Sequence, residues 1–184
     1  MSGFEVLGSE VLHHTHVFDV VQCSVRLSHG AVIERSIIRH PGAVAIVAID
    51  DEGRWLLIRQ YRLAVQRELL EIPAGTLDHD EVPEETAQRE LREETGFAAD
   101  SLQRLGGTWM VPGYCDEYIH YFLATGLRPD PLAHDEDEHL SAPIPMTYDQ
   151  VVESVEDGRI QDAKTAVALM LYDRHRQRGT RGVA

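Results

Sequence analysis

The chain has 184 residues and a formal net charge of −14. Its length suits one domain with a proper core, and its acidic balance argues against nonspecific binding to nucleic acid or to an anionic membrane surface. No apolar run approaches the roughly 18 residues that span a bilayer. An anionic substrate would need bound cations or clustered arginines to approach so acidic a protein.

The first ten residues, M-S-G-F-E-V-L-G-S-E, contain neither a basic nor a hydrophobic segment, so no secretory signal is expected. Cys23 and Cys115 lie far apart in the sequence and match no metal-binding or redox spacing. Both observations favour a cytoplasmic location, where thiols stay reduced.

Residues 1–40 are predicted to form an antiparallel β-segment. Apolar residues alternate over part of 17–27, S-H-G at 28–30 supplies a turn, and the next strand follows over 31–39. His40-Pro41-Gly42 then breaks the chain. We therefore divide the chain into this β-segment and a main domain over 41–184.

The main domain is predicted to open with a buried strand over 43–49, the longest apolar run in the chain. D-D-E-G after it reads as a hairpin-like turn, and 54–62 is expected to return as the partner strand. A helix is predicted over 84–95, because Pro83 suits its first position and Gly96 is placed to end it in the left-handed conformation.

Another strand pair is expected over 103–111 and 117–124, followed by a loop from 125 to 141. A capping box formed by Thr147 and Gln150 predicts a helix over 148–157, and a last helix is expected over 162–177. Helices set among strands without regular alternation indicate an α/β sandwich rather than a doubly wound fold.

The helix over 84–95 concentrates negative charge on one side. Glu90 and Glu94 lie about 6 Å apart along the helix axis, and Glu93 is three residues after Glu90. Like charges at such spacings destabilise a helix, but carboxylates placed this way can share a hard cation such as Mg2+. The alternative is a solvated helix on which Arg89 simply pairs with Glu93.

Residues 75–97 read G-T-L-D-H-D-E-V-P-E-E-T-A-Q-R-E-L-R-E-E-T-G-F. This stretch resembles the Nudix box, G-x5-E-x7-R-E-U-x-E-E-x-G-U with U bulky and apolar, at every specified position. The fixed gaps over such a length make the match specific. The resemblance to Nudix hydrolases implies a Nudix α/β/α sandwich with a mixed sheet, preceded by the N-terminal antiparallel β-segment.

The resemblance also implies roles within the box. Glu90 and Glu94 would be Mg2+ ligands, with Mn2+ as an alternative ion, and Glu93 would be a further ligand or a contact to the catalytic water. Glu81 and Arg89 would form a structural ion pair. Gly75 and Gly96 would have structural roles in the backbone of the loop–helix–loop that the box forms.

Three further stretches resemble the ADP-ribose pyrophosphatase subfamily. In E-I-P-A-G, the Ala74 carbonyl would help to bind metal. In V-P-G-Y-C-D-E, the turn carrying Gly113 and Glu117 would contact substrate; Cys115 replaces the usual Thr or Ser, and a plain turn is the alternative.

The third stretch is the acidic loop over 135–138, where Glu136 would be the general base and Glu138 a metal contact. A solvated loop without a role is the alternative. The aromatic residue usual after this loop is missing from S-A-P-I-P-M, which leaves the register open by two residues.

Two arginines complete the expected site. Arg62, in R-Q-Y-R, resembles a substrate contact, and Arg35 resembles a residue that reaches adenine from the partner subunit. The subfamily exchanges its N-terminal strands between two protomers, so a homodimer is expected.

The leading function is Mg2+-dependent hydrolysis of the pyrophosphate of ADP-ribose to AMP and ribose 5-phosphate. Another nucleoside diphosphate sugar, such as GDP-mannose or an ADP-sugar, is the nearest alternative substrate. A non-catalytic nucleotide sensor is a third reading, but such domains often lose glutamates of the box, and every one is present here.

Overall fold

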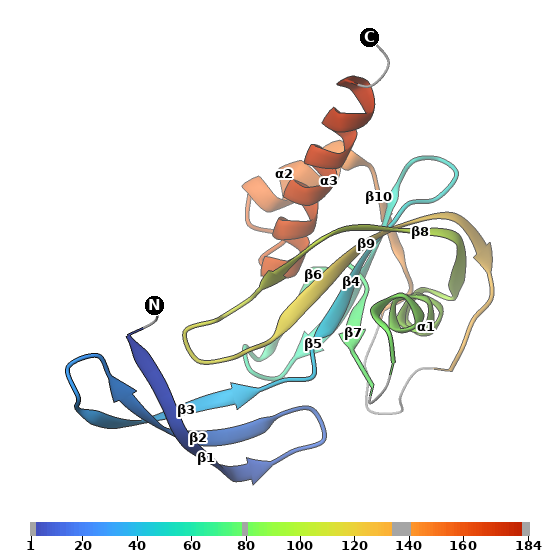
Figure 1. The fold of residues 1–184 in the computed structure, drawn as a ribbon. Helices are drawn as coiled ribbons and strands as arrows, with labels where there is room; N and C mark the ends of the chain where they lie inside the picture. The colour runs from blue at the N-terminus through green and yellow to red at the C-terminus, as the bar shows by residue number, and fades with distance from the viewer. Residues whose placement is uncertain (1–2, 79–80, 134–140, 182–184) are drawn as a thin grey trace. The chain divides into compact units, whose positions relative to one another are not determined.

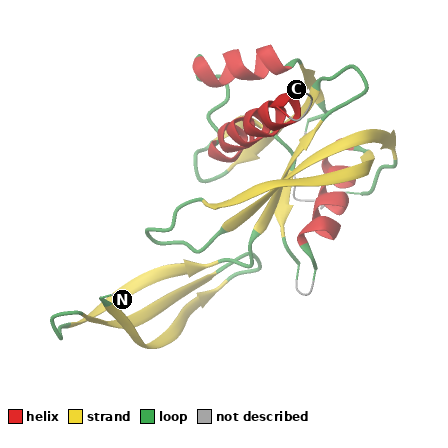
Figure 2. Cartoon of the chain, turned by 45° about the horizontal axis from the view of Figure 1, so that its top comes forward, coloured by secondary structure: helices red, strands yellow, loops and turns green. Residues whose placement is uncertain are grey.

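The computed structural model describes residues 3–78, 81–133 and 141–181. The chain divides into two compact units. The first unit contains Met1–Gly42 and Trp109–Tyr118, and the second contains Ala43–Thr108 and Ile119–Ala184. Figure 1 shows the elements along the chain, and Figure 2 distinguishes helices from strands.

The first unit is built on a three-stranded antiparallel sheet in the order β1-β2-β3, as expected for the N-terminal segment. Its strands are β1 (Phe4–His14), β2 (Asp19–Leu27) and β3 (Val32–Arg39). Val21, Cys23 and Val25 alternate along β2, and their buried side chains form the small core of this sheet. Residues 28–30 form the predicted turn between β2 and β3.

Strand β1 is an exposed edge strand. Every residue of Phe4–His14 is exposed, including Phe4 and Val6 at 65% each and Val11 at 54%. Two register irregularities interrupt its pairing with β2. The sequence does not predict β1 as a separate strand, because neither face of it is buried and its apolar residues do not alternate.

The second unit contains two sheets and three helices. The four-stranded sheet has the order β7-β4-β9-β8, formed by Ala74–Thr76, Ala43–Ala48, Tyr118–Pro129 and Phe97–Trp109. The three-stranded sheet has the order β10-β5-β6, formed by Ile144–Met146, Trp55–Arg62 and Arg67–Glu71. The helices are α1 (Pro83–Thr95), α2 (Tyr148–Glu156) and α3 (Ala163–Arg181).

Strand β4 lies at the centre of this unit and is buried along its whole length. Val44, Ile46 and Ala48 pack with Ala87 and Leu91 of α1 in one hydrophobic cluster. Helix α3 also contacts β4, and Figure 1 shows α1 on one side of the sheet with α2 and α3 on the other. This arrangement confirms the predicted α/β class with a mixed sheet.

One expected pairing is wrong. Residues 50–53 form the predicted turn, but β5 does not pair with β4 beyond a single bridge between Ile49 and Trp55. The two edges of β4 are occupied by β7, which is antiparallel to it, and by β9, which is parallel. Strand β5 pairs instead with β6 and β10.

The helices follow their local signals closely. Helix α1 has Pro83 in its first turn and ends at Gly96, whose φ of 77° is left-handed. The capping box of Thr147 and Gln150 opens α2. Strand boundaries differ more: β8 begins at Phe97 rather than 103, and β9 continues to Pro129 into the expected loop. No helix among the described residues is long and apolar enough to cross a membrane.

Candidate active site

The C-terminal half of α1 carries an acidic cluster. Glu90 and Glu94 are 7% and 4% exposed, and the Glu93 side chain is 20% exposed. Ala87 and Leu91, on the adjoining face, are fully buried in the core. The packing that seats the helix therefore also holds Glu90 and Glu94 out of bulk water, while Glu93 is half-buried.

Arg89 donates hydrogen bonds to four residues around this cluster. Its Nε and Nη2 donate to the two carboxylate oxygens of Glu81 at 3.1 and 3.0 Å. Its Nη1 donates to Glu90 at 2.7 Å and to Glu93 at 3.0 Å, and Nη2 also reaches the Thr76 carbonyl at 3.3 Å. The expected ion pair with Glu81 is present, in the two-pronged geometry that only a guanidinium provides.

Strand β7 brings backbone against the two buried glutamates. The Ala74 N–H donates to Glu94 Oε2 at 2.8 Å. A Cβ added to Gly75 would lie 1.9 to 2.4 Å from the carboxyl atoms of Glu90, so only glycine leaves room for that side chain. The requirement for glycine at the start of the box is therefore steric and concerns Glu90 directly.

The electrostatics of the cluster are unbalanced. Hydrogen bonds from Arg89 outweigh burial and hold the pKa of Glu81 below its usual range, with a further bond from Thr86. Despite burial, the bond to Glu81 and the charge of Glu90 raise the pKa of Arg89. One guanidinium pairs with Glu81, Glu90 and Glu93, so carboxylates outnumber the cation in these contacts.

These residues fit a hard divalent cation. Buried carboxylate oxygens are the donors that Mg2+ prefers, and it is commonly held by one or two carboxylates together with waters and substrate phosphates. Within residues 3–78, 81–133 and 141–181, no group of three or more His, Cys, Asp or Glu side chains is arranged to hold a metal alone.

Arg62 lies in a second charged cluster. Its Nη2 donates to Glu71 at 2.5 Å, and Lys164 Nζ donates to the other oxygen of Glu71 at 2.6 Å and to Asp162 at 3.0 Å. Glu71 is 0% exposed, and Thr165 completes the group by donating to Asp162. Sequence reasoning missed Glu71, although an acid flanked by apolar residues in L-L-E-I-P was a usable signal.

In the first unit, Asp116 ties the 109–118 segment to the end of β3. Its carboxylate accepts from Arg39 Nη1 at 2.7 Å and from the His40 N–H at 2.8 Å. Burial acts to raise the pKa of Asp116, but these two donors outweigh it and keep the pKa below its usual range. Beside it, the backbone of the buried Cys115 forms an isolated parallel β-bridge with Ile38. Asp116 was not singled out in the sequence.

The other expected substrate contacts in this unit occupy its surface. Gly113 is exposed in the 109–118 segment, and Glu117 is half-buried, with its carbonyl accepting from the Met110 N–H at 3.2 Å. Arg35 is exposed on β3, where its guanidinium donates to the Glu34 carbonyl. Glu136 and Glu138, the expected base and metal contact, lie outside the described residues.

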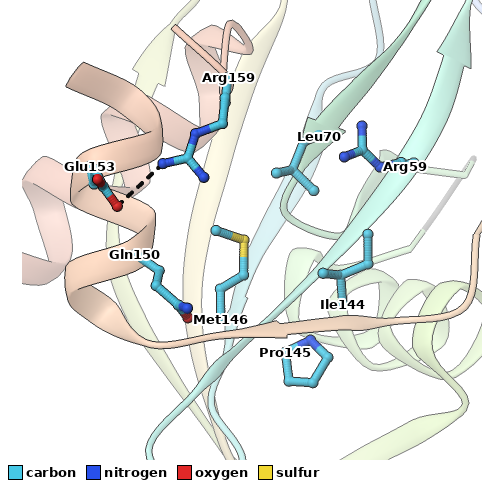
Figure 3. Close-up of a pocket in the computed structure, with 8 residues that line it drawn as sticks. All are labelled: Arg59, Leu70, Ile144, Pro145, Met146, Gln150, Glu153 and Arg159. Carbon is cyan, nitrogen blue, oxygen red and sulfur yellow. Dashed lines mark ion pairs between the residues drawn. The ribbon is translucent and has the colours of Figure 1, made fainter. Parts of the chain in front are cut away.

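A separate cavity of about 440 Å³ lies beside α2 and the β10-β5-β6 sheet. Its apolar wall includes Leu70 and Met146 (Figure 3). On its rim, Arg159 is neutralised by Asp157 at 2.6 Å and Glu153 at 3.3 Å. None of its lining residues belongs to α1 or β7, so it is not part of the acidic cluster.

Comparison with known proteins agrees with the box. The NUDIX domain family matches residues 39–169. The chain is 38% identical over 167 residues to an ADP-ribose pyrophosphatase of Bacillus subtilis (strain 168), covering 90% of each. It is 43% identical over 141 residues to an ADP-ribose pyrophosphatase of Mycobacterium tuberculosis (strain ATCC 25618 / H37Rv), covering 75% of this chain and 68% of that one.

A crystal structure described as an ADP compounds hydrolase superposes with a TM-score of 0.82 at 29% identity, covering 98% of this chain and 97% of that one. The resemblance of residues 75–97 to the Nudix box is thus supported by sequence similarity over most of the chain and by similarity of the fold. The chain belongs to the NUDIX domain family.

Proposed function

We propose that the protein hydrolyses the pyrophosphate of ADP-ribose to AMP and ribose 5-phosphate, with Mg2+ as its metal ion. The observation that carries the proposal is the pair of buried carboxylates of Glu90 and Glu94, beside Glu93 and the Arg89 that bonds to Glu90 and Glu93. The choice of ADP-ribose as substrate follows the ADP-ribose pyrophosphatases that resemble the chain over most of its length.

Glu90 and Glu94 would hold the metal, joined by the Ala74 carbonyl and by Glu138. When bound, Mg2+ neutralises phosphate charge, orients the substrate and makes a water molecule more acidic. Mn2+ offers the same oxygen-ligand chemistry. A bound cation also explains how a substrate with two phosphates approaches a protein of formal charge −14.

The chain's own groups supply position and proton transfer. Arg89 fixes the Glu90 and Glu93 carboxylates, and Glu81 fixes Arg89 in turn, so the cluster is held in place before substrate arrives. Water attacks one phosphorus, the bridging P–O bond breaks, and a carboxylate accepts the proton of the water. Glu93 and Glu136 are the two candidates for that carboxylate.

Substrate contacts are proposed for Arg62, Arg35, Gly113 and Glu117. Arg62 is already oriented by the buried Glu71, so little side-chain entropy would be lost when it met an anionic group. Arg35 is proposed to act across a dimer, from the partner's N-terminal segment.

We also propose a homodimer in which residues 1–40 are exchanged between protomers and 41–184 form the hydrolase domain. Strand β1 supports this, because it is an edge strand whose exposed apolar side chains offer both hydrogen-bonding groups and surface to a second copy. A cytoplasmic location completes the proposal, because the free thiols of Cys23 and Cys115 would stay reduced there.

A phosphatase-coupled assay with Mg2+ tests the reaction on ADP-ribose, GDP-mannose, ADP-glucose and NADH. Intact ADP-ribose has no terminal phosphate for the coupling enzyme, whereas both products do. We expect phosphate release mainly from ADP-ribose and its loss in EDTA. Release mainly from another substrate would contradict the choice of ADP-ribose, and binding without release from any of them would favour a nucleotide sensor.

A further inference from the structure

A second cavity, of about 200 Å³, lies between β8 and α3 in the second unit. Leu171, Arg174, His175 and Arg178 line it from α3, at the spacing that places residues on one face of a helix. Residues 103–105 line it from β8. Leu171 packs 3.4 Å from the position of a Cβ on Gly106, so the helix and the strand meet closely at this point.

The lining is strongly basic in a strongly acidic protein. Arg104, Arg174 and Arg178 are among the lining residues, and none of the described residues that line the cavity is acidic. None of the three arginines forms an ion pair with any residue that the structure describes. This distinguishes the cavity from the 440 Å³ one, where Glu153 and Asp157 neutralise Arg159.

His120 reports the same positive environment. Its Nδ1 lies 2.8 Å from Arg104 Nη2, which can only donate in this contact. Burial and the Arg104 charge lower the pKa of His120, and the opposing influence of Glu84 is smaller. The Arg104 charge that contributes to this shift would favour an anion over a cation.

We propose that this cavity binds a phosphate group, carried by inorganic phosphate or by a small phosphomonoester. Guanidinium groups match phosphate oxygens in pairs of hydrogen bonds, and Gln103 and His175 add further donors to the lining. Leu105 and Leu171 offer apolar surface to a compact organic group. The volume is below the roughly 300 Å³ of sites for drug-sized ligands, so a whole dinucleotide does not fit.

The test is a titration of the isotope-labelled protein with sodium phosphate, followed by nuclear magnetic resonance in EDTA at constant ionic strength. EDTA leaves the acidic cluster of α1 without a cation, so phosphate has no reason to bind there. The outcome is therefore independent of the proposed hydrolase activity. We expect saturable shifts at residues 103–105, 120 and 171–178, and none with chloride.

The double variant Arg174→Gln/Arg178→Gln should weaken phosphate binding by roughly tenfold or more, because each lost contact is a hydrogen bond between charged groups. Arg26→Gln/Arg128→Gln removes the same charge from exposed positions elsewhere and should leave the affinity unchanged. Arg104→Gln, on the strand, tests the site again should the helix variant fail to fold.

Ribose 5-phosphate and AMP, titrated in the same way, identify the carrier: tighter binding than inorganic phosphate indicates a phosphomonoester, and equal or weaker binding indicates free phosphate. The proposal is overturned if phosphate causes no saturable shifts at these residues, or if the helix variant and its control bind it equally. It is also overturned if a glutamate-rich peptide shifts these residues and phosphate does not.

Discussion

The second unit contains two clusters of buried charge that differ in their balance. Around Glu71, two cations and two carboxylates meet: Arg62 and Lys164 donate to Glu71, and Lys164 and Thr165 donate to Asp162. At α1, one guanidinium meets three glutamates, and a fourth, Glu94, accepts from the Ala74 N–H. The Glu71 carboxylate is matched by its own cations, whereas carboxylates outnumber the cation around Arg89, and we infer that a divalent cation would bind at the second cluster rather than the first.

The largest expected effect comes from removing charge in the unbalanced cluster. Glu94→Gln keeps an oxygen that can accept from the Ala74 N–H but loses a metal ligand. We expect turnover of ADP-ribose to fall by roughly two orders of magnitude or more, with the unfolding midpoint kept. Glu85→Gln, at an exposed position of the same helix, is the control and should retain activity. Full activity in both Glu94→Gln and Glu90→Gln would refute the metal assignment.

A steric change should reach the same cluster without altering its charge. Gly75→Ala places a methyl group within 2.4 Å of the Glu90 carboxyl atoms and must displace them. We expect turnover to fall by roughly ten- to a hundredfold, because the misplaced carboxylate is a proposed metal ligand. Gly8→Ala meets no atom within 4 Å and should be silent in the same assay. Equal turnover in the two variants would show that Glu90 need not lie against β7.

The balanced cluster should respond in stability rather than in turnover. Glu71→Gln breaks two ion pairs at a fully buried carboxylate, which typically lowers the free energy of unfolding by about 3–5 kcal/mol. Urea unfolding measures the loss, and Glu68→Gln, exposed on the same strand, serves as its control. A large fall in turnover at saturating substrate without loss of stability would instead place Glu71 in the reaction.

The smallest effect concerns acid pH. Because the pKa of Glu81 is lowered in the folded state, its pairing with Arg89 stabilises the protein fully above the ordinary glutamate pKa, and this stabilisation is lost as pH falls through the lowered value. Glu81→Gln should cost about 1.5–3 kcal/mol near neutral pH and less in acid. Urea midpoints measured from neutral to acid pH would show the two proteins converging. A constant difference at every pH would exclude this linkage.

Local signals explain what the sequence predicted well. Pro83 and Gly96 bound α1, Thr147 and Gln150 open α2, and the spacing of Glu90 and Glu94 places both on a buried face. These features depend on residues within a few positions of one another, where backbone geometry is nearly fixed.

Partners distant in sequence could not be predicted in the same way. The turn after β4 suggested a hairpin with β5, but the choice between β5, β7 and β9 depends on how the whole sheet packs. The ion pair of Glu71 with Lys164 joins residues 93 positions apart. The R-Q-Y-R motif predicts Arg62 as a substrate contact. No residue near Arg62 in the sequence indicated that its side chain would pair with Glu71.

The most direct test of the central claim is the unfolding midpoint of EDTA-treated protein titrated with Mg2+. Binding to the folded state alone raises the midpoint as the ligand concentration rises. We predict that Mg2+ stabilises the wild-type protein, and that Glu90→Gln/Glu94→Gln unfolds at the same temperature with or without Mg2+. Equal stabilisation of the two proteins would contradict the assignment of the acidic cluster as the cation site.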